Sequence, residues 1–194
     1  MTGNSDGAAI ENIAPVKSIR VDGPGAWRIS KFSTKRADTI CMPGRVASAF
    51  MGYTTAPDGW WQSFVSASPA RTGKVAVTRA DGSPHVAPVW VDLDGDQIVF
   101  MTAANTIKGK SILRDGRVAV CFDDEQPPFS FVTVTGTTTT STDPTDLMYW
   151  ATRIAERYMG AELAAQYGQR NGVPPEMIVR VTPTNIAAKV NIAD

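Results

Sequence analysis

The stretch from Lys74 to Glu125 constrains what this chain can fold into more than any other part of its 194 residues. Short apolar runs alternate there with turn dipeptides, in the order Val75–Val77, Asp81-Gly82, His85–Asp92, Asp94-Gly95 and Gln97–Thr102. Asp-Gly between two such runs indicates a β-hairpin, because tight hairpin turns require the positive φ that glycine readily adopts. The pattern therefore predicts a series of consecutive antiparallel strands.

One helix interrupts this series. The segment Asn105–Arg114 places Ile107 and Ile112 among basic side chains, which indicates a short basic helix that ends at Asp115-Gly116. The run Arg117–Phe122 then predicts a fourth strand, rich in the β-branched and aromatic residues that strands favour.

The rest of the domain adds strands and helices on both sides of this stretch. Pro88 has no backbone N–H, so it must face a sheet edge, a bulge or a ligand. Gly136, inside a β-branched run, indicates a bulge or a close backbone approach.

We expect a first helix over 58–68, a strand over 129–139, a helical segment from Asp143-Pro144 to about 168 with a break at Gly160, a strand over 177–182 and an extended segment over 186–190. The fold class predicted is mainly β, a small barrel of about six or seven antiparallel strands with two or three helices.

The N-terminal quarter of the chain has a different character. Residues 1–50 are rich in Gly, Pro, Ser and Asn and show no sustained periodicity. We expect this part to be a flexible or disordered arm, followed by a barrel domain over 51–194.

Composition excludes several classes of function. The formal net charge is zero, so no global attraction to nucleic acid or to an anionic membrane surface is expected. No apolar run is long enough to span a bilayer, and the N-terminus lacks the apolar core of a secretory signal, so we expect a cytoplasmic protein. Cys41 and Cys121 have no metal-ligand spacing, and we expect Cys121 to be a buried, inert thiol.

The sequence also lacks the common catalytic motifs. His85 is the only histidine and has no cysteine nearby, which argues against a zinc site and against a Ser-His-Asp hydrolase. No Rossmann or P-loop glycine pattern is present. The acidic run Asp123–Glu125 is typical of a solvated turn, so no metal site is expected, and no catalytic residue is identified.

One group of residues points to an anion site. Thr106 is a good N-cap for the basic helix, Thr102 ends the strand before it, and Lys108 and Lys110 lie in its first turn. Free N–H groups, the helix dipole and lysine ammonium groups together favour a phosphate. Solvated surface lysines would show the same spacing, and the spacing does not decide between the two interpretations.

The order of these motifs resembles a known superfamily. A strand, an Asp-Gly turn, Ser-Pro-His, a hairpin, F-M-T-x-x-x-T-x-K-G-K and R-D-G-R-V-A-V together resemble the pyridoxamine 5′-phosphate oxidase-like proteins. More narrowly, they resemble the actinobacterial members that use the deazaflavin coenzyme F420. The resemblance covers about Trp60 to the C-terminus.

The resemblance implies a split β-barrel of the FMN-binding type that forms a homodimer, with the cofactor in a groove between subunits. The implied cofactor-binding residues follow two consecutive strands and the helix after them: Ala87, Pro88, Val89, Trp90, Met101, Thr102, Thr106, Ile107, Lys108 and Lys110. Among these, Lys108 corresponds to the phosphate-binding lysine of the family. Trp90 and Phe131 are candidates for the pocket wall.

Departures from the family pattern select among cofactors. FMN-dependent oxidases carry arginines where this chain has Ala87 and Ile107, and their C-terminal Arg-Leu segment has no clear match here. The resemblance thus implies hydride transfer from reduced F420 to an unsaturated small molecule. The alternatives are an FMN-binding oxidoreductase or electron-transfer protein, and a carrier that binds F420 without turnover.

Overall fold

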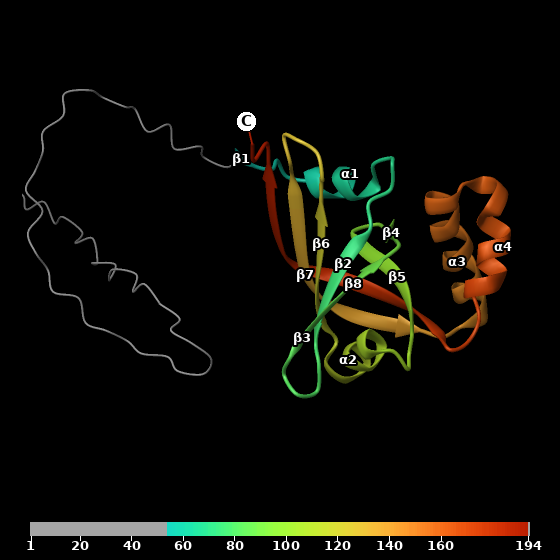
Figure 1. Ribbon diagram of the computed structural model, residues 1–194. Helices are drawn as coiled ribbons and strands as arrows, with labels where there is room; N and C mark the ends of the chain where they lie inside the picture. Colours follow the sequence, from blue (N-terminus) through green and yellow to red (C-terminus); the bar gives the residue numbers. More distant parts are fainter. Residues whose placement is uncertain (1–53, 194) are drawn as a thin grey trace, which may run out of the picture. The chain divides into compact units, whose positions relative to one another are not determined.

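The computed structural model describes residues 54–193, which form eight strands and four helices (Figure 1). The predicted arm, residues 1–50, lies outside the described residues. In chain order the elements are β1 Thr54–Thr55, α1 Trp60–Ser66, β2 Gly73–Thr78, β3 Pro84–Val89, β4 Val91–Asp94, β5 Gln97–Ala103, α2 Ile107–Asp115, β6 Arg117–Asp123, β7 Phe131–Ser141, α3 Pro144–Met159, α4 Ala161–Asn171 and β8 Glu176–Val190.

The strands form one antiparallel sheet that curls on itself. The strand order is β3-β2-β6-β7-β8-β5-β4, with β1 paired to β8. β3 and β4 therefore lie at opposite ends of the order, yet Trp90 alone separates Val89 from Val91 in the chain. The sheet must curl until its two ends meet, and we call the line where β3 and β4 meet the seam. This geometry confirms the predicted mainly β, barrel-type fold.

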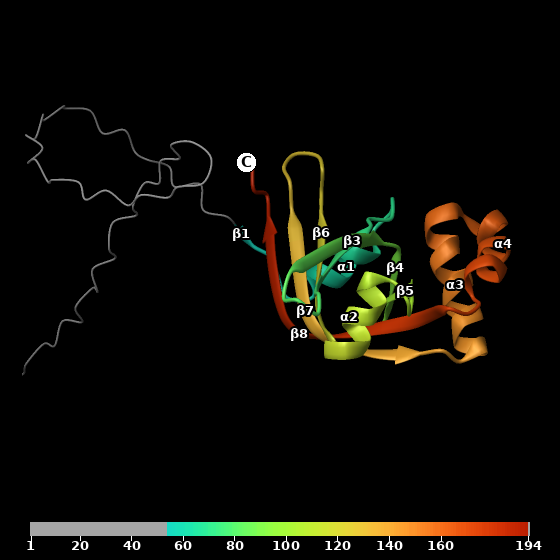
Figure 2. The ribbon, with the colours of Figure 1, turned by 60° about the horizontal axis from the view of Figure 1, so that its bottom comes forward.

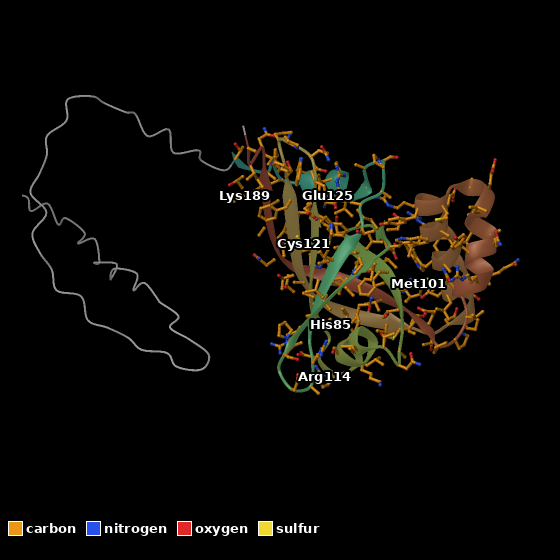
Figure 3. All side chains as sticks on the ribbon, in the orientation of Figure 1. His85, Met101, Arg114, Cys121, Glu125 and Lys189 are labelled. Carbon is orange, nitrogen blue, oxygen red and sulfur yellow. The ribbon has the colours of Figure 1, made fainter. Side chains whose placement is uncertain are left out.

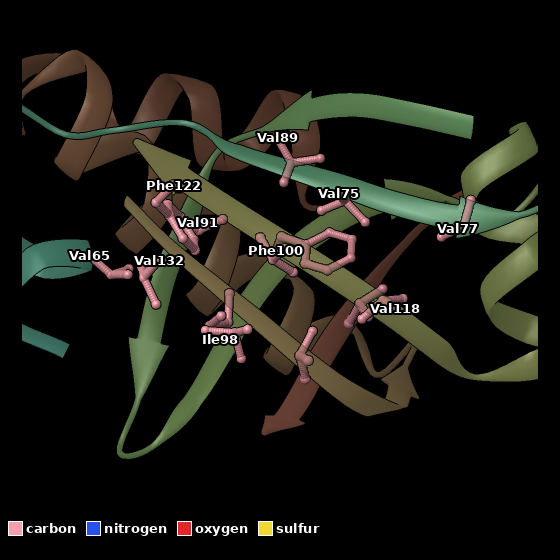
Figure 4. Close-up of a cluster of buried hydrophobic side chains, with 14 of the residues drawn as sticks. Val65, Val75, Val77, Val89, Val91, Ile98, Phe100, Val118, Phe122 and Val132 are labelled. Atoms are coloured by element: carbon pink, nitrogen blue, oxygen red, sulfur yellow. The ribbon is translucent and has the colours of Figure 1, made fainter. Parts of the chain in front are cut away.

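The interior of the curl holds the main hydrophobic core. Alternate residues of each strand point inward, since successive side chains of a strand face opposite sides. Phe100 and Phe122 are fully buried at the centre, among valines of β2, β6 and β7 (Figure 4). The helix α1 contributes Trp61, Phe64 and Val65 to the same cluster, because their spacing of three and four residues puts them on one face of the helix.

A second cluster lies outside the curl, where the α3–α4 hairpin packs on the sheet. Val99 of β5 and Ile178 of β8 are fully buried against Leu147, Trp150 and Ile154 of α3. The hairpin lies beside β4 and β5 in both views (Figures 1 and 2). The outer face of this part of the sheet is thus covered by helices, whereas no helix within residues 54–193 covers the outer face of β2, β3 and β6.

Local signals place the helix ends as predicted. Asp143 accepts hydrogen bonds from the backbone N–H groups of Thr145 and Asp146 at 2.9 and 3.0 Å, and Pro144 is the first helical residue of α3. Gly160, at φ +86°, separates α3 from α4. The helix expected over Asn105–Arg114 is α2, with Thr106 as its N-cap.

The structure also differs from the expectations in detail. The run His85–Asp92 is two strands, because the chain changes sheet end at Trp90. The expected C-terminal segments are one strand, β8, which continues through Pro183. Together with β1, these changes give eight strands among the described residues, in place of about six or seven. The break at Gly160 divides the C-terminal helical segment into α3 and α4, which gives four helices in place of two or three.

Two smaller expectations need correction. The Asp81-Gly82 hairpin exists, but its connection spans five residues, from 79 to 83, and only Gly82 has a positive φ. Cys121 is half-buried, because Val120 and Phe122 occupy the inward positions of β6 and leave Cys121 on the outer face.

Neither a metal-binding cluster nor a membrane-spanning helix is found among the described residues. Among residues 54–193 no group of three or more His, Cys, Asp or Glu side chains is placed to hold a metal ion. Within the same range no helix is long and apolar enough to cross a membrane.

Gly136 lies at the bulge that the sequence predicts. The β7–β8 register shifts between Thr135 and Gly136, and a Cβ atom at Gly136 would collide with the Thr182 carbonyl oxygen. We expect Gly136→Ala to lower the free energy of unfolding by about 1–3 kcal/mol through overpacking. Urea denaturation measures the loss. Thr139→Ala, at an exposed position of the same strand, is the control and should change stability by about 0.5 kcal/mol or less; equal losses in both variants would contradict the bulge argument.

Candidate functional site

A groove of about 290 Å³ opens beside the seam, between the sheet and the α3–α4 hairpin. Its apolar walls come from the end of β3, from β5 and from α3, and its polar side chains come from α2, α4 and β8. The lining residues are Pro88, Val89, Trp90, Met101, Lys108, Ala151, Ile154, Asn171 and Glu176. Met101 lies on the side of the sheet that faces the hairpin (Figure 3).

The Trp90 indole is held in place by two tyrosines of the hairpin. It stacks on the Tyr158 ring with a centroid separation of 5.0 Å and an interplanar angle of 6°, and the Tyr167 ring lies 6.0 Å away at a tilt. The Tyr158 hydroxyl accepts a hydrogen bond from the Val91 N–H at 3.0 Å and donates one to the Arg71 carbonyl oxygen at 2.6 Å. Tyr158 therefore fixes both the indole and the backbone at the seam.

The N-cap of α2 sets the direction of Lys108. The Thr106 hydroxyl oxygen accepts from the Gly109 N–H at 3.0 Å, and the hydroxyl itself donates to the Ala103 carbonyl oxygen at 2.8 Å. The Thr102 and Thr106 hydroxyl oxygens are 3.1 Å apart. Both threonines are thus engaged in holding the start of α2, which directs Lys108 into the groove.

Two opposite charges share the polar end of the groove. Burial lowers the pKa of the Lys108 ammonium group, and the Glu176 carboxylate partly offsets this effect. Burial raises the pKa of Glu176, and Lys108 partly offsets that in turn. The ion pairs found within residues 54–193 do not include one between these two side chains. Within the described residues, neither charge is thus held in an ion pair.

The structure brings five of the ten predicted cofactor-binding residues together. They are Pro88, Val89, Trp90, Met101 and Lys108, and all five line the groove. This arrangement joins the end of β3 to the first turn of α2, as the resemblance implies. Whether these residues bind a cofactor stays a prediction.

The other five predicted residues have different surroundings. Ala87 pairs with the core residue Val75, so its side chain faces the interior of the curl. Thr102 is buried on the inward face of β5, and Thr106 is the helix cap. Ile107 and Lys110 are exposed on other faces of α2. None of the five lines the groove, and their roles as cofactor contacts remain predictions.

Sequence reasoning missed four lining residues. Ala151 and Ile154 lie three positions apart on the face of α3 that packs on the sheet, and that helical spacing could have indicated them. Asn171 ends α4 and Glu176 begins β8, and no local signal distinguishes either of them. Phe131, a predicted wall residue, is the first residue of β7. It pairs with Asp123 and Lys189 and does not line the groove.

The acidic run at the end of β6 has a structural role. Asp124 forms an ion pair with Arg71 at 2.6 Å, and Asp123 forms one with Lys74. Both pairs line a separate polar hollow of about 330 Å³. Each of these two carboxylates therefore has a cationic partner, and both ion pairs join the end of β6 to residues at or before the start of β2.

Comparisons with known proteins agree with this architecture. The family described as pyridoxamine 5′-phosphate oxidase matches residues 62–189. No curated protein matches the chain.

The solved structures that share the fold include the following three. The conserved hypothetical protein Rv2991 from Mycobacterium tuberculosis is 23% identical, with a TM-score of 0.60 over 69% of this chain and 84% of that protein. A protein described as F420 reductase is 24% identical, with a TM-score of 0.52 over 68% and 98%. A putative 5-nitroimidazole antibiotic resistance protein from Bacteroides thetaiotaomicron is 16% identical, with a TM-score of 0.55 over 71% and 87%.

Tyr158→Phe tests how the groove wall is fixed. The phenyl ring keeps the stacking on Trp90, but the fully buried Val91 loses the acceptor for its N–H. We expect the free energy of unfolding to fall by about 1–3 kcal/mol, the cost of an unsatisfied buried polar group. Denaturant titration followed by tryptophan fluorescence measures it. Tyr167→Phe is the control, because the Tyr167 hydroxyl makes no hydrogen bond within the described residues; an equally large loss there would refute the argument.

Proposed function

The chain belongs to the pyridoxamine 5′-phosphate oxidase family, and from this premise we propose that it is an F420-dependent reductase. In this proposal reduced deazaflavin transfers a hydride to an unsaturated small molecule. The observation that carries the proposal is the groove at the seam, where apolar walls and a tryptophan lie next to the half-buried ammonium group of Lys108.

The lining of the groove suits a flat ring with an anionic substituent. Pro88, Trp90, Met101 and Ile154 offer apolar surface to a planar heterocycle, and such surface also excludes water from the reacting atoms. Lys108 is the one cation among the lining residues, at the position where the family resemblance implies a phosphate contact. A lysine ammonium group binds phosphate as a compact point charge.

The proposal assigns binding and orientation to the protein. Reduced deazaflavin, when bound, supplies the hydride. Trp90 and Met101 would position the ring, Lys108 would hold the phosphate, and the α3 wall formed by Ala151 and Ile154 would leave room for the substrate. The deazaflavin is preferred over FMN because the arginines expected for FMN are replaced by the inward-facing Ala87 and the exposed Ile107.

A homodimer is part of the proposal. The outer face of β2, β3 and β6 carries an open hollow of about 400 Å³ with Ala76, Pro84 and Ala119 in its lining. Val86, on the edge strand β3, is 60% exposed. A largely apolar face that no helix of the described residues covers suits a second copy of this chain, which would complete the cofactor site between subunits.

The first experiment is a titration of the purified protein with coenzyme F420 and, in parallel, with FMN, followed by cofactor fluorescence. We expect micromolar or tighter binding of F420 and weaker binding of FMN. Preference for FMN would identify a flavin protein instead, and binding of neither would reject the groove as a cofactor site. Turnover of the reduced cofactor with enone and quinone substrates then separates a reductase from a carrier.

Lys108→Ala tests the phosphate contact. We expect it to weaken F420 binding by about 1.5–3 kcal/mol, or roughly 10- to 150-fold in Kd, as for the loss of a charge-assisted hydrogen bond. Lys110→Ala removes the same charge two residues away, at an exposed position outside the groove. It should change Kd by less than about threefold, because exposed charges are screened. Equal effects of the two variants would show that only overall charge matters.

The proposed dimer gives a separate prediction. Light scattering on the wild-type protein should yield twice the chain mass, and Val86→Asp should yield the chain mass, because it places a charge on the apolar outer face. Leu163→Asp, at a 38% exposed position of α4, should leave the dimer intact. A wild-type monomer that binds cofactor normally would contradict the proposed arrangement.

A further inference from the structure

The polar end of the groove is built from two elements that backbone hydrogen bonds hold together. Glu176 begins β8 and pairs with Ala103, the last residue of β5. The Ala104 N–H donates to the Pro175 carbonyl oxygen at 3.0 Å. The chain between Ala103 and α2 is therefore anchored to the start of β8, and this anchoring fixes Glu176 relative to Lys108.

The charges at this end of the groove balance. Of the nine lining residues, Lys108 is the one cation and Glu176 the one anion. No ion pair within the described residues joins them directly. Both side chains are half-buried, so solvent screens their fields less than it would at the surface. An anion that binds Lys108 must also experience the negative field of Glu176.

This field acts unequally on the two kinds of phosphate that flavin-like cofactors carry. A phosphomonoester such as that of FMN has a charge of about −1.5 to −2 at neutral pH, because its second pKa is about 6. The phosphate of F420 is a diester and carries a single charge. Repulsion by Glu176 scales with ligand charge, so the monoester is destabilised about twice as much as the diester.

We propose that Glu176 is a specificity-determining residue, whose negative charge disfavours a doubly charged phosphomonoester relative to a singly charged phosphodiester at the anion end of the groove. This inference rests on the proposed function, in which Lys108 holds the cofactor phosphate. It assigns to Glu176 a charge-dependent penalty against FMN-type ligands, separate from any recognition of the ring.

The test compares ligands that share one ring and differ in phosphate charge. They are the deazaflavin alcohol of F420, the 5′-phosphate monoester of this alcohol and the methyl diester of that phosphate. Their Kd values are measured by fluorescence at pH 8, where the monoester is doubly charged, for the full-length wild type, Glu176→Gln and Glu176→Asp. Glu176→Gln keeps the size of the side chain and removes its charge.

We expect Glu176→Gln to tighten binding of the monoester about tenfold more than binding of the diester, the size expected when one unit of charge repulsion in partly buried surroundings is removed. Binding of the uncharged alcohol should not change. Glu176→Asp, which keeps the charge, should retain the wild-type ratio of monoester to diester Kd. Glu162→Gln, at an exposed position in the first turn of α4, should also retain it.

An unchanged ratio of monoester to diester Kd in Glu176→Gln would overturn the inference. If this ratio did not change but F420 binding still depended on Lys108, the inference about Glu176 would fail and the proposed function would stand. If the wild type bound none of the three deazaflavins, the proposed function and this inference would both be overturned. If binding of the alcohol changed as much as binding of the monoester, Glu176 would act on the ring and the charge argument would be wrong.

Discussion

The one-residue connection at Trp90 is the constraint on which the rest of the structure depends. β3 and β4 occupy the two ends of the strand order, and a single residue cannot span an open sheet. The sheet must therefore curl, and this curl buries Phe100 and Phe122 completely in its interior. The same constraint places Trp90 at the seam, outside the core, where Tyr158 stacks on it. The groove thus lies where the fold closes.

The α3–α4 hairpin converts the seam into a groove by covering one side of it. α3 buries the outer residues Val99 and Ile178, and Arg157 donates hydrogen bonds to the last carbonyl groups of α1, among them that of Ser66 at 2.9 Å. The hairpin is thus attached both to the sheet and to the end of α1. Ala151 is buried and small, so α3 leaves open space opposite the tip of β3.

Features whose causes lie within a few residues could be predicted from the sequence. The cap at Asp143, the cap at Thr106 and the bulge at Gly136 each follow from local backbone chemistry. Features produced by strand pairing could not. Glu176 reaches the groove only because β8 pairs with β5, more than seventy residues earlier, and β8 continues through Pro183 because this residue lies opposite Gly136 at the bulge, where the regular ladder is interrupted.

The spacing of Lys108 and Lys110 alone could not decide whether they form an anion site. A phosphate site and a solvated surface both fit two lysines in the first turn of a basic helix. Two residues on a helix are separated by about 200°, so the two lysines must face different surroundings. The groove and Glu176 lie on one side, and solvent lies on the other. Each interpretation therefore fits one of the two lysines. Lys108 is half-buried, as an anion site requires, and Lys110 is exposed, as a solvated surface charge is.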